Sequence, residues 1–280
     1  MDQTYKKDVE SRTMRTPAEV LPRRVELRGG VSVLLREAAA PAGRAAPRVL
    51  LVHPANMQAA SWDRVVARLP ADWSCAAVDL PGHGRSAPRA DYDLATWTAS
   101  CRHVLDELGW PAAHGVGASV GAAVLAALAA TDPARVRTLT TVGGACRAAS
   151  AADTAEFLAE LDRLGAGELL RAIVAGEPGL TPEQAADAVA HTVPGAVRAQ
   201  VAAIWRAAAA SAALDHADRI TCPVLAVVGE HDQGCPVADS AELARRTGGR
   251  LAVLAGQGHL PLYGAAGDVA DLVRAHVTGR

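Results

Sequence analysis

The strongest chemical signal in the chain is a serine between small residues, in the segment GASVG at residues 117–121. The bare G-x-S-x-G pattern is weak evidence, because so short a motif also arises by chance. Its context is more specific, since an apolar run at residues 112–117 leads into it and a helical pattern at residues 119–131 leads out of it. A strand, a sharp turn and a helix in this order predict that the Ser119 hydroxyl projects from a sheet as a nucleophile, with the Val120 N–H facing a developing oxyanion.

A nucleotide site is a weaker interpretation of the same segment. Gly115, Gly117 and Gly121 form a glycine pattern between a strand and a helix, as dinucleotide-binding loops do. Such a loop also needs an acidic residue at the end of the next strand to hold a ribose, and that strand ends TLTTVGGA, without a carboxylate. The sequence contains no P-loop, H-E-x-x-H or calcium-loop motif either, so we expect no cofactor and no metal.

A serine in this position needs a sheet to hold it, and the chain alternates between strand and helix patterns. The alternation starts with a predicted hairpin, residues 25–37, around a tight Gly29-Gly30 turn. Repeated strand–helix units then predict an α/β fold with a mainly parallel, doubly wound sheet and helices on both faces. The predicted strands are residues 48–53, 75–79, 112–117, 136–142, 222–230 and 250–256, and the predicted helices are 61–69, 96–108, 119–131, 237–246 and 267–277.

The alternation stops between residues 145 and 213, where only helical patterns remain. One helix start is clear there, because Thr181 is a good cap and Pro182 suits the first helical position. This segment is predicted to be a helical insertion between two strands. Residues 23–144 and 214–280 would form the α/β core, and residues 1–22, which have no periodic pattern, a flexible tail.

Charge and composition exclude several classes of protein. The 28 basic and 30 acidic residues leave a net charge of −2, which offers no footprint for nucleic acid or an anionic membrane. Five widely spaced cysteines favour reduced, buried thiols over a disulfide framework. The polar N-terminus lacks a signal-peptide pattern, and no apolar run is long enough to span a bilayer. We therefore expect a cytoplasmic protein that acts on a small-molecule substrate.

Five motifs, taken together, resemble the α/β-hydrolase superfamily, in particular its capped bacterial esterases and lactonases with a serine nucleophile. The similarity covers residues 25–278 and implies the α/β-hydrolase fold, with residues 145–213 as a helical cap or lid. The motifs are VLLVHPANMQAASW at 49–62, DLPGHGRS at 79–86, GASVG at 117–121, PVLAVVGEHD at 223–232 and GQGHLP at 256–261.

The order of catalytic residues in that superfamily implies Ser119 as nucleophile, Asp232 as acid and His259 as base. The base would take the serine proton, and the acid would fix the imidazole tautomer and stabilise the imidazolium. Asp153 and Asp215, both in the helical segment, are the rival acids.

Several residues also have structural interpretations. Ser119 could be a helix cap and Asp232 a turn residue. His231, next to Asp232, is the rival base. We expect His83 to stabilise a turn and His114 to be a buried strand histidine with a satisfied ring.

The loop after residue 52 departs from the commonest family pattern, because His53 is followed by Pro54 where many relatives have glycine. Proline has no N–H, so the resemblance implies an oxyanion hole made by the Ala55 and Val120 amides. Asn56 would lie at the pocket mouth, either as an additional donor or closing the turn with its own side chain. Met57 would lie beside it.

The remaining pocket candidates are apolar. Phe157 and Trp205, in the helical segment, line a substrate cleft or pack the interior of the cap, and Leu260 follows the predicted base. The resemblance implies a serine hydrolase of esters, lactones or related acyl substrates acting through an acyl-enzyme. Two alternatives stay open: a natural-product enzyme using the same triad for cyclisation, acyl transfer or C–C cleavage, and a ligand-binding protein without catalysis. The sequence does not indicate an oligomeric state.

Overall fold

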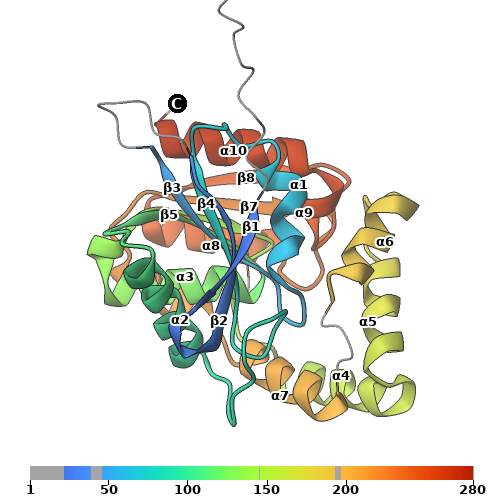
Figure 1. Ribbon diagram of the computed structural model, residues 1–280. Coiled ribbons are helices and arrows are strands. Elements are labelled where there is room, and N and C mark those ends of the chain that lie inside the picture. The colour runs from blue at the N-terminus through green and yellow to red at the C-terminus, as the bar shows by residue number, and fades with distance from the viewer. Residues whose placement is uncertain (1–21, 39–45, 145, 193–196, 280) are drawn as a thin grey trace, which may run out of the picture.

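The computed structural model describes residues 22–38, 46–144, 146–192 and 197–279. These residues form one eight-stranded sheet in the order β1-β2-β4-β3-β5-β6-β7-β8 (Figure 1). β1 and β2 form the antiparallel hairpin and β2 also pairs antiparallel with β4, while all other neighbours are parallel. The strands are β1 (Arg23–Leu27), β2 (Val31–Arg36), β3 (Arg48–Val52), β4 (Ser74–Asp79), β5 (Ala113–Ala118), β6 (Val136–Val142), β7 (Val224–Gly229) and β8 (Arg250–Leu254). The predicted fold class is confirmed.

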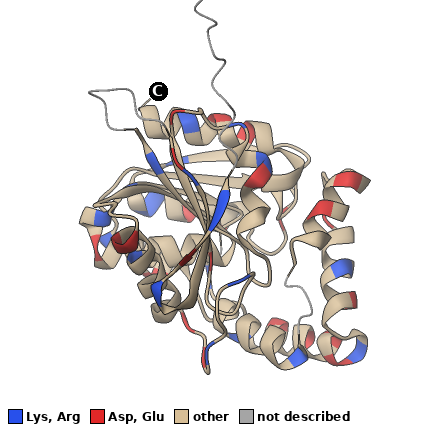
Figure 2. Cartoon of the chain, in the orientation of Figure 1, with Lys and Arg blue, Asp and Glu red and all other residues tan. Residues whose placement is uncertain are grey.

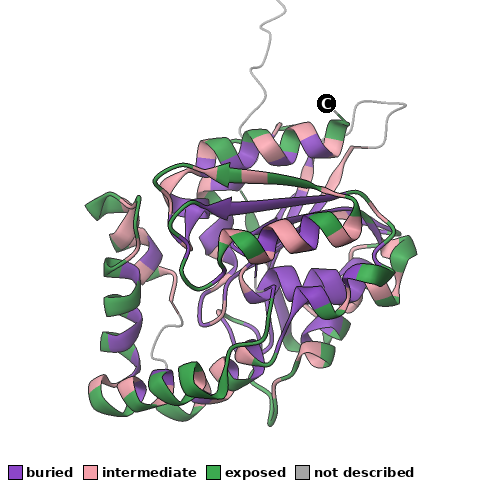
Figure 3. Ribbon diagram, turned by 180° about the vertical axis from the view of Figure 1, so that it is seen from behind, coloured by how far each residue is buried: buried purple, intermediate pink, exposed green. Residues whose placement is uncertain are grey.

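Helices cover both faces of the sheet. Helices α2 (Leu94–Glu107), α3 (Val120–Thr131) and α8 (Val237–Thr247) contribute to one buried cluster, and α1 (Asp63–Val66), α9 (Pro261–Gly264) and α10 (Ala266–Thr278) contribute to the other. The central strands and α3 are almost wholly buried (Figure 3). Helix α3 is apolar on all sides, as expected for a fully buried helix. Packing around α3 holds it in place, so the turn that precedes it is attached to a fixed element.

Local sequence signals explain where several elements begin. The hairpin turn has Gly29 and Gly30 at φ 75° and 74°, a region that glycine enters without steric cost. Thr181 caps α6 (Pro182–Ala190) through the Gln184 N–H, and the Gln184 side chain accepts the Thr181 N–H in return. The predicted start of this helix is confirmed.

The predicted helix at residues 61–69 is wrong in its extent. The α-helical part, α1, has only four residues and follows a 3₁₀ turn at Ala59–Trp62. The Asp79 carboxylate accepts the Ala59 N–H at 2.7 Å and so fixes the start of that turn. At the other end, the Arg68 N–H donates to the Val65 carbonyl, three residues earlier, as in a 3₁₀ turn. Only a short stretch between the two turns is regular α-helix.

In the described part of the chain, four α-helices lie between β6 and β7: α4 (Ala151–Leu164), α5 (Ala166–Ala175), α6 and α7 (Arg198–Ala209). They stand at the edge of the core, with α4 and α7 at the bottom of Figure 1 and α5 and α6 at its right. Between residues 146 and 213 the described chain contains no strand. We call the segment 145–213 the cap.

Two cap contacts reach the core through α6 and the turn after it. Arg64 of α1 pairs with Asp187 and Glu183 of α6. His191 Nδ1 lies 3.0 Å from the Tyr263 hydroxyl of α9. The cap is therefore held to the core by polar contacts as well as by packing.

The other expectations concern thiols, charge and membrane spans. All five cysteines are free thiols, and four of them are buried, as predicted. Acidic and basic residues are interspersed along the helices (Figure 2). No helix in the described residues is both long and apolar enough to cross a bilayer. The expected tail, residues 1–22, lies outside the described residues except for Pro22.

Candidate active site

Ser119 occupies the sharp turn between β5 and α3. Its backbone has φ 50° and ψ −122°, and it is one of two non-glycine residues with positive φ in the described chain. Such a conformation is strained for any side chain with a Cβ. It is held in place by the Ser119 N–H, which donates to the Val142 carbonyl at 3.1 Å.

The glycines on either side of Ser119 are required by close backbone contacts. A Cβ on Gly121 would lie 2.2 Å from the Val52 carbonyl oxygen, and one on Gly117 would lie 2.3 Å from the Gly121 oxygen. Neither contact is possible for a larger residue without moving the backbone. The two glycines therefore let α3 start directly against β3 and β5, which is what tightens the turn at Ser119.

Asp232 and His259 meet at the carboxyl ends of β7 and β8. His259 Nδ1 lies 3.0 Å from both carboxylate oxygens of Asp232. The Asp232 side chain is fully buried, whereas that of His259 is 22% exposed. Asp232 Oδ1 also accepts the Cys235 N–H at 2.8 Å, and the His231 N–H donates to the Gln257 carbonyl, which ties the two loops together.

Gly143 connects this pair to the serine turn. It follows Val142, whose carbonyl accepts the Ser119 N–H, and its own N–H donates to Val227 of β7. A Cβ on Gly143 would lie 3.1 Å from Asp232 Oδ2 and 3.4 Å from His259 Nδ1, in a backbone with φ 51°. The end of β6 thus places the serine turn on one side and the Asp–His pair on the other.

The His259 ring titrates in an unusual environment. Burial disfavours its protonated form, but the Cys235 thiol and the Asp232 carboxylate outweigh this effect and raise the pKa of His259 well above its ordinary value. Within the described residues, no hydrogen bond joins the Ser119 hydroxyl to this ring. Such contacts are often loose in ligand-free sites and tighten with substrate.

Cys235 places a third possible metal-ligand atom next to Asp232 and His259. Donor atoms of Asp232, Cys235 and His259 all lie within 4.8 Å of one another. A cysteine, a histidine and a carboxylate are a set that zinc can use. An ion here would displace the Nδ1 proton that His259 shares with Asp232, so the geometry suits the Asp–His pair better than a metal.

The loop after β3 leaves the backbone N–H of Ala55 available to a ligand. Ala55 is half-buried, Asn56 is buried with φ 58°, and the turn closes through the Met57 N–H to the Pro54 carbonyl. Within the described residues, no turn, loop or side-chain acceptor takes the N–H of Ala55 or of Val120. Asn56 Oδ1 is buried without a partner, so the side chain does not close the turn itself.

His53 and Asp79 support this loop. His53 Nε2 accepts the Leu80 N–H at 3.1 Å, so its Nδ1 donates to the Pro54 carbonyl at 2.7 Å. Asp79, fully buried at the end of β4, accepts the Arg85 N–H and pairs with Arg24. Asp79 was not among the predicted site residues, although its place in the DLPGHGRS motif was a signal.

The rival acids and the rival base lie elsewhere. Asp153 forms a capping box with Ser150 at the start of α4, and Asp215 is exposed. The side chain of His231 is 56% exposed and lies 3.8 Å from Glu230.

His83 and His114 have structural surroundings. His83 is buried, with Nδ1 3.2 Å from the Pro81 carbonyl, and packs against His53. His114 Nδ1 lies 3.0 Å from the Thr138 hydroxyl, and burial lowers the pKa of His114 to about 4.

The apolar pocket candidates are mostly packed. Phe157 and Trp205 stack with ring centroids 3.8 Å apart, inside a small cluster formed by the cap helices themselves. Met57 and Leu260 are buried in the cluster on the α10 face of the sheet.

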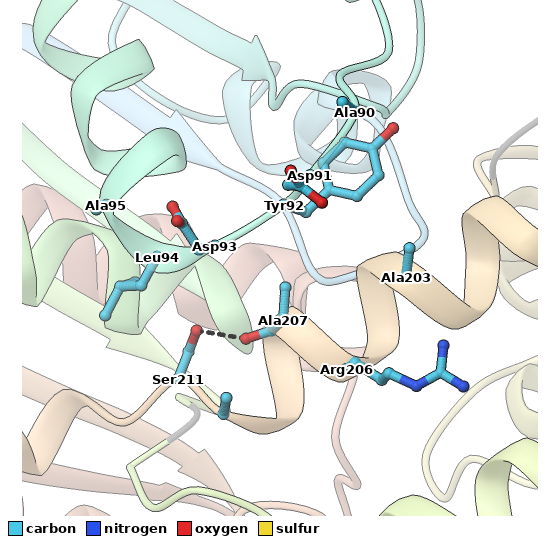
Figure 4. Close-up of a pocket in the computed structure, with 11 residues that line it drawn as sticks. Ala90, Asp91, Tyr92, Asp93, Leu94, Ala95, Ala203, Arg206, Ala207 and Ser211 are labelled. Carbon is cyan, nitrogen blue, oxygen red and sulfur yellow. Dashed lines mark hydrogen bonds between the residues drawn. The ribbon is translucent and has the colours of Figure 1, made fainter.

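A surface pocket of about 610 Å³ lies between the start of α2 and the cap helix α7 (Figure 4). Tyr92, Leu94 and Arg206 are among its lining residues, and Ser211 donates to the Ala207 carbonyl at its edge. Neither Ser119 nor the Asp–His pair lines it. This pocket is therefore separate from the candidate catalytic residues.

Glu177 is a residue near the pair that sequence reasoning missed. It belongs to the cap, just after α5, and its Oε2 accepts the backbone N–H of His259 at 2.7 Å. Burial raises the pKa of the Glu177 carboxyl, while the His259 ring and amide act to lower it. No motif marks the position, because 82 residues separate it from His259.

Comparison with known proteins gives consistent results. Residues 49–272 match the family described as the alpha/beta hydrolase family. The chain is 30% identical over 250 residues to a pimeloyl-[acyl-carrier protein] methyl ester esterase from Neisseria meningitidis, covering 84% of this chain and 95% of the relative.

Solved structures show the same fold. An enol-lactonase from Burkholderia xenovorans superposes with a TM-score of 0.80 at 22% identity, covering 91% of this chain and 100% of that one. A thermophilic esterase from Thermogutta terrifontis superposes with a TM-score of 0.78 at 20% identity, covering 92% and 98%.

Proposed function

This chain belongs to the α/β-hydrolase family and is an enzyme of that family, and on this premise we propose that it is a serine hydrolase of carboxylic esters, lactones or related acyl compounds. The observation that carries the proposal is the contact of His259 Nδ1 with both Asp232 oxygens, beside the strained turn of Ser119. The proposed substrate is a small molecule, as the name of the enol-lactonase suggests, whereas the Neisseria relative is named for an ester carried on an acyl-carrier protein.

In the proposed reaction, Ser119 attacks the acyl carbonyl while His259 Nε2 takes its proton. Asp232 keeps the Nδ1 proton in place and stabilises the imidazolium. The Ala55 and Val120 amides, which have no loop acceptor among the described residues, donate to the oxyanion of the tetrahedral intermediate. Collapse expels the alcohol, which takes the proton from His259, and water activated by the same base releases the acyl group.

Asn56 Oδ1 is a free acceptor and is suited to a hydrogen-bond donor of the substrate. Its side chain is 1% exposed and its Oδ1 has no partner. A buried amide left unpaired is costly, so a ligand that pairs with it would gain affinity. The reaction described needs no metal and no organic cofactor.

Hydrolysis of a panel of aryl acyl esters and lactones tests the proposal. We expect wild-type turnover and loss of it in Ser119→Ala, with unchanged thermal unfolding. Product mass identifies the reaction, since hydrolysis adds the mass of water whereas cyclisation does not. Equal turnover by wild type and Ser119→Ala would exclude this serine as the nucleophile.

A further inference from the structure

The backbone of the candidate base is held by a side chain from the cap. The His259 N–H donates to Glu177 Oε2 at 2.7 Å, and the adjacent Gly258 N–H donates to the Pro178 carbonyl at 3.1 Å. Two successive amides of the loop that carries His259 therefore have acceptors in the cap. A catalytic histidine gains its precision from such restraints, because displacements of about 1 Å lower rates by as much as 100-fold.

The cap segment 177–179 and the loop at residues 256–259 lie so close together that an added Cβ would clash. A Cβ on Gly258 would lie 2.6 Å from Glu177 Oε2 and 2.6 Å from Pro178 Cδ, and one on Gly179 would lie 2.7 Å from the Gly256 carbonyl oxygen. Glycines on both sides thus permit the approach of the two loops.

Glu177 itself is placed by the end of α5. Its N–H donates to the Val174 carbonyl at 3.2 Å, and Val174 is buried in the same cluster as Leu260. The carboxylate is half-buried, and burial raises its pKa, while the hydrogen bond from the His259 main chain and the charge of the His259 ring act against this effect and the Asp232 carboxylate adds to it.

From these contacts we infer that Glu177 is a positioning residue for His259, and that the Asp–His pair is complete only while the cap segment 177–179 is seated on the loop at residues 256–259. The inference rests on the proposed serine hydrolase function. It couples the cap to the chemistry through the main chain of the base, and not through contact with the substrate.

The test compares Glu177→Ala and Glu177→Gln with wild type in turnover and in the rate of labelling by a small fluorophosphonate. Glutamine keeps an oxygen that accepts the His259 N–H, whereas alanine removes the acceptor. We expect Glu177→Ala to lower kcat and the labelling rate by about 10-fold or more, with KM little changed, and Glu177→Gln to restore most of both. If Glu177 only stabilised the fold, we would not expect Glu177→Gln to restore activity while the defect of Glu177→Ala was confined to kcat.

Two further variants complete the design. Glu183→Ala removes an exposed cap carboxylate that pairs with Arg64 and should match wild type. Gly258→Ala should also lower kcat, since its Cβ would lie 2.6 Å from both Glu177 Oε2 and Pro178 Cδ and would push the cap segment off the loop. Folding of each variant is checked by thermal unfolding.

The outcomes separate the two proposals. Wild-type labelling with an unchanged Glu177→Ala, or with Glu177→Gln as impaired as Glu177→Ala, would overturn the role of Glu177 and leave the hydrolase standing. Absence of labelling and turnover in folded wild type would instead overturn the proposed function itself.

Discussion

His259 Nδ1 lies 3.0 Å from both oxygens of the Asp232 carboxylate, which is fully buried and also accepts the Cys235 N–H. The side chain of His259 is 22% exposed, so the ring is not closed off from solvent. An imidazole held in this way has one nitrogen committed to the acid and the other free to exchange a proton with a substrate group.

The first prediction concerns the acid. Asp232→Asn keeps the shape of the side chain but removes the charge that fixes the tautomer, so kcat should fall by a factor on the order of 10⁴. The matched control is Asp153→Asn, which alters the rival acid at the start of α4 and should change kcat little. Steady-state kinetics on one ester measures both, and the reverse ranking would assign the acid to the cap.

The second prediction concerns pH. Asp232 and Cys235 raise the pKa of His259 well above its ordinary value despite burial. The base must be unprotonated to act, so kcat/KM should rise with pH and level off only above the usual histidine range. A profile already flat at neutral pH would contradict this environment for the ring.

Cys235→Ala refines the same measurement. The thiol contributes to the raised pKa, so its removal should move the acidic limb of kcat/KM toward lower pH while leaving the alkaline plateau in place. Cys222→Ala is the control, because Cys222 lies just before β7 and away from the pair. A limb that moves equally in both variants would argue against a specific effect of Cys235.

The third prediction concerns stability at the serine. Ser119 has φ 50°, which costs a residue with a Cβ about 1 kcal/mol or more. Ser119→Gly should therefore raise the free energy of unfolding by about 1 kcal/mol while abolishing turnover, whereas Ser119→Ala should abolish turnover without that gain. Chemical denaturation measures the difference, and equal stabilities would show that the turn stores no strain.

The fourth prediction tests the backbone contact behind the serine. Gly121→Ala should destabilise the fold by about 2 kcal/mol or more, because its Cβ would lie 2.2 Å from the Val52 oxygen. Gly267→Ala, in α10, has no atom closer than 3.8 Å to the new Cβ and should be neutral or stabilising. Similar unfolding midpoints for the two variants would contradict the close approach of α3 to β3.

Sequence patterns predicted the sheet well because the inner strands β3, β4, β5 and β7 are almost wholly buried and read as apolar runs, and because Gly29 and Gly30 mark the hairpin turn. Thr181 likewise marks the start of α6. The extent of α1 was missed because its start is set by Asp79, a contact between distant segments. Phe157 and Trp205 were candidates for a cleft or for the interior of the cap, and only the structure shows that they stack on each other.

The site was less predictable than the fold. Motifs could place Ser119, Asp232 and His259 at strand ends, because parallel strands bring those ends to one edge of the sheet. Glu177 could not be found in this way, since its contact with His259 depends on how the cap folds back across 82 residues. Gly143 could not be found from the sequence either, because a glycine has no functional side chain. The structure shows why a glycine is needed there, since a Cβ would lie 3.4 Å from His259 Nδ1.

The most direct test of the central claim is labelling with a fluorophosphonate probe, followed by mass spectrometry of the modified peptide. We expect the label on Ser119 in the wild type and its loss in His259→Ala, because the serine then has no base. Label on a different residue, or undiminished label on Ser119 in folded His259→Ala, would contradict a serine nucleophile activated by His259.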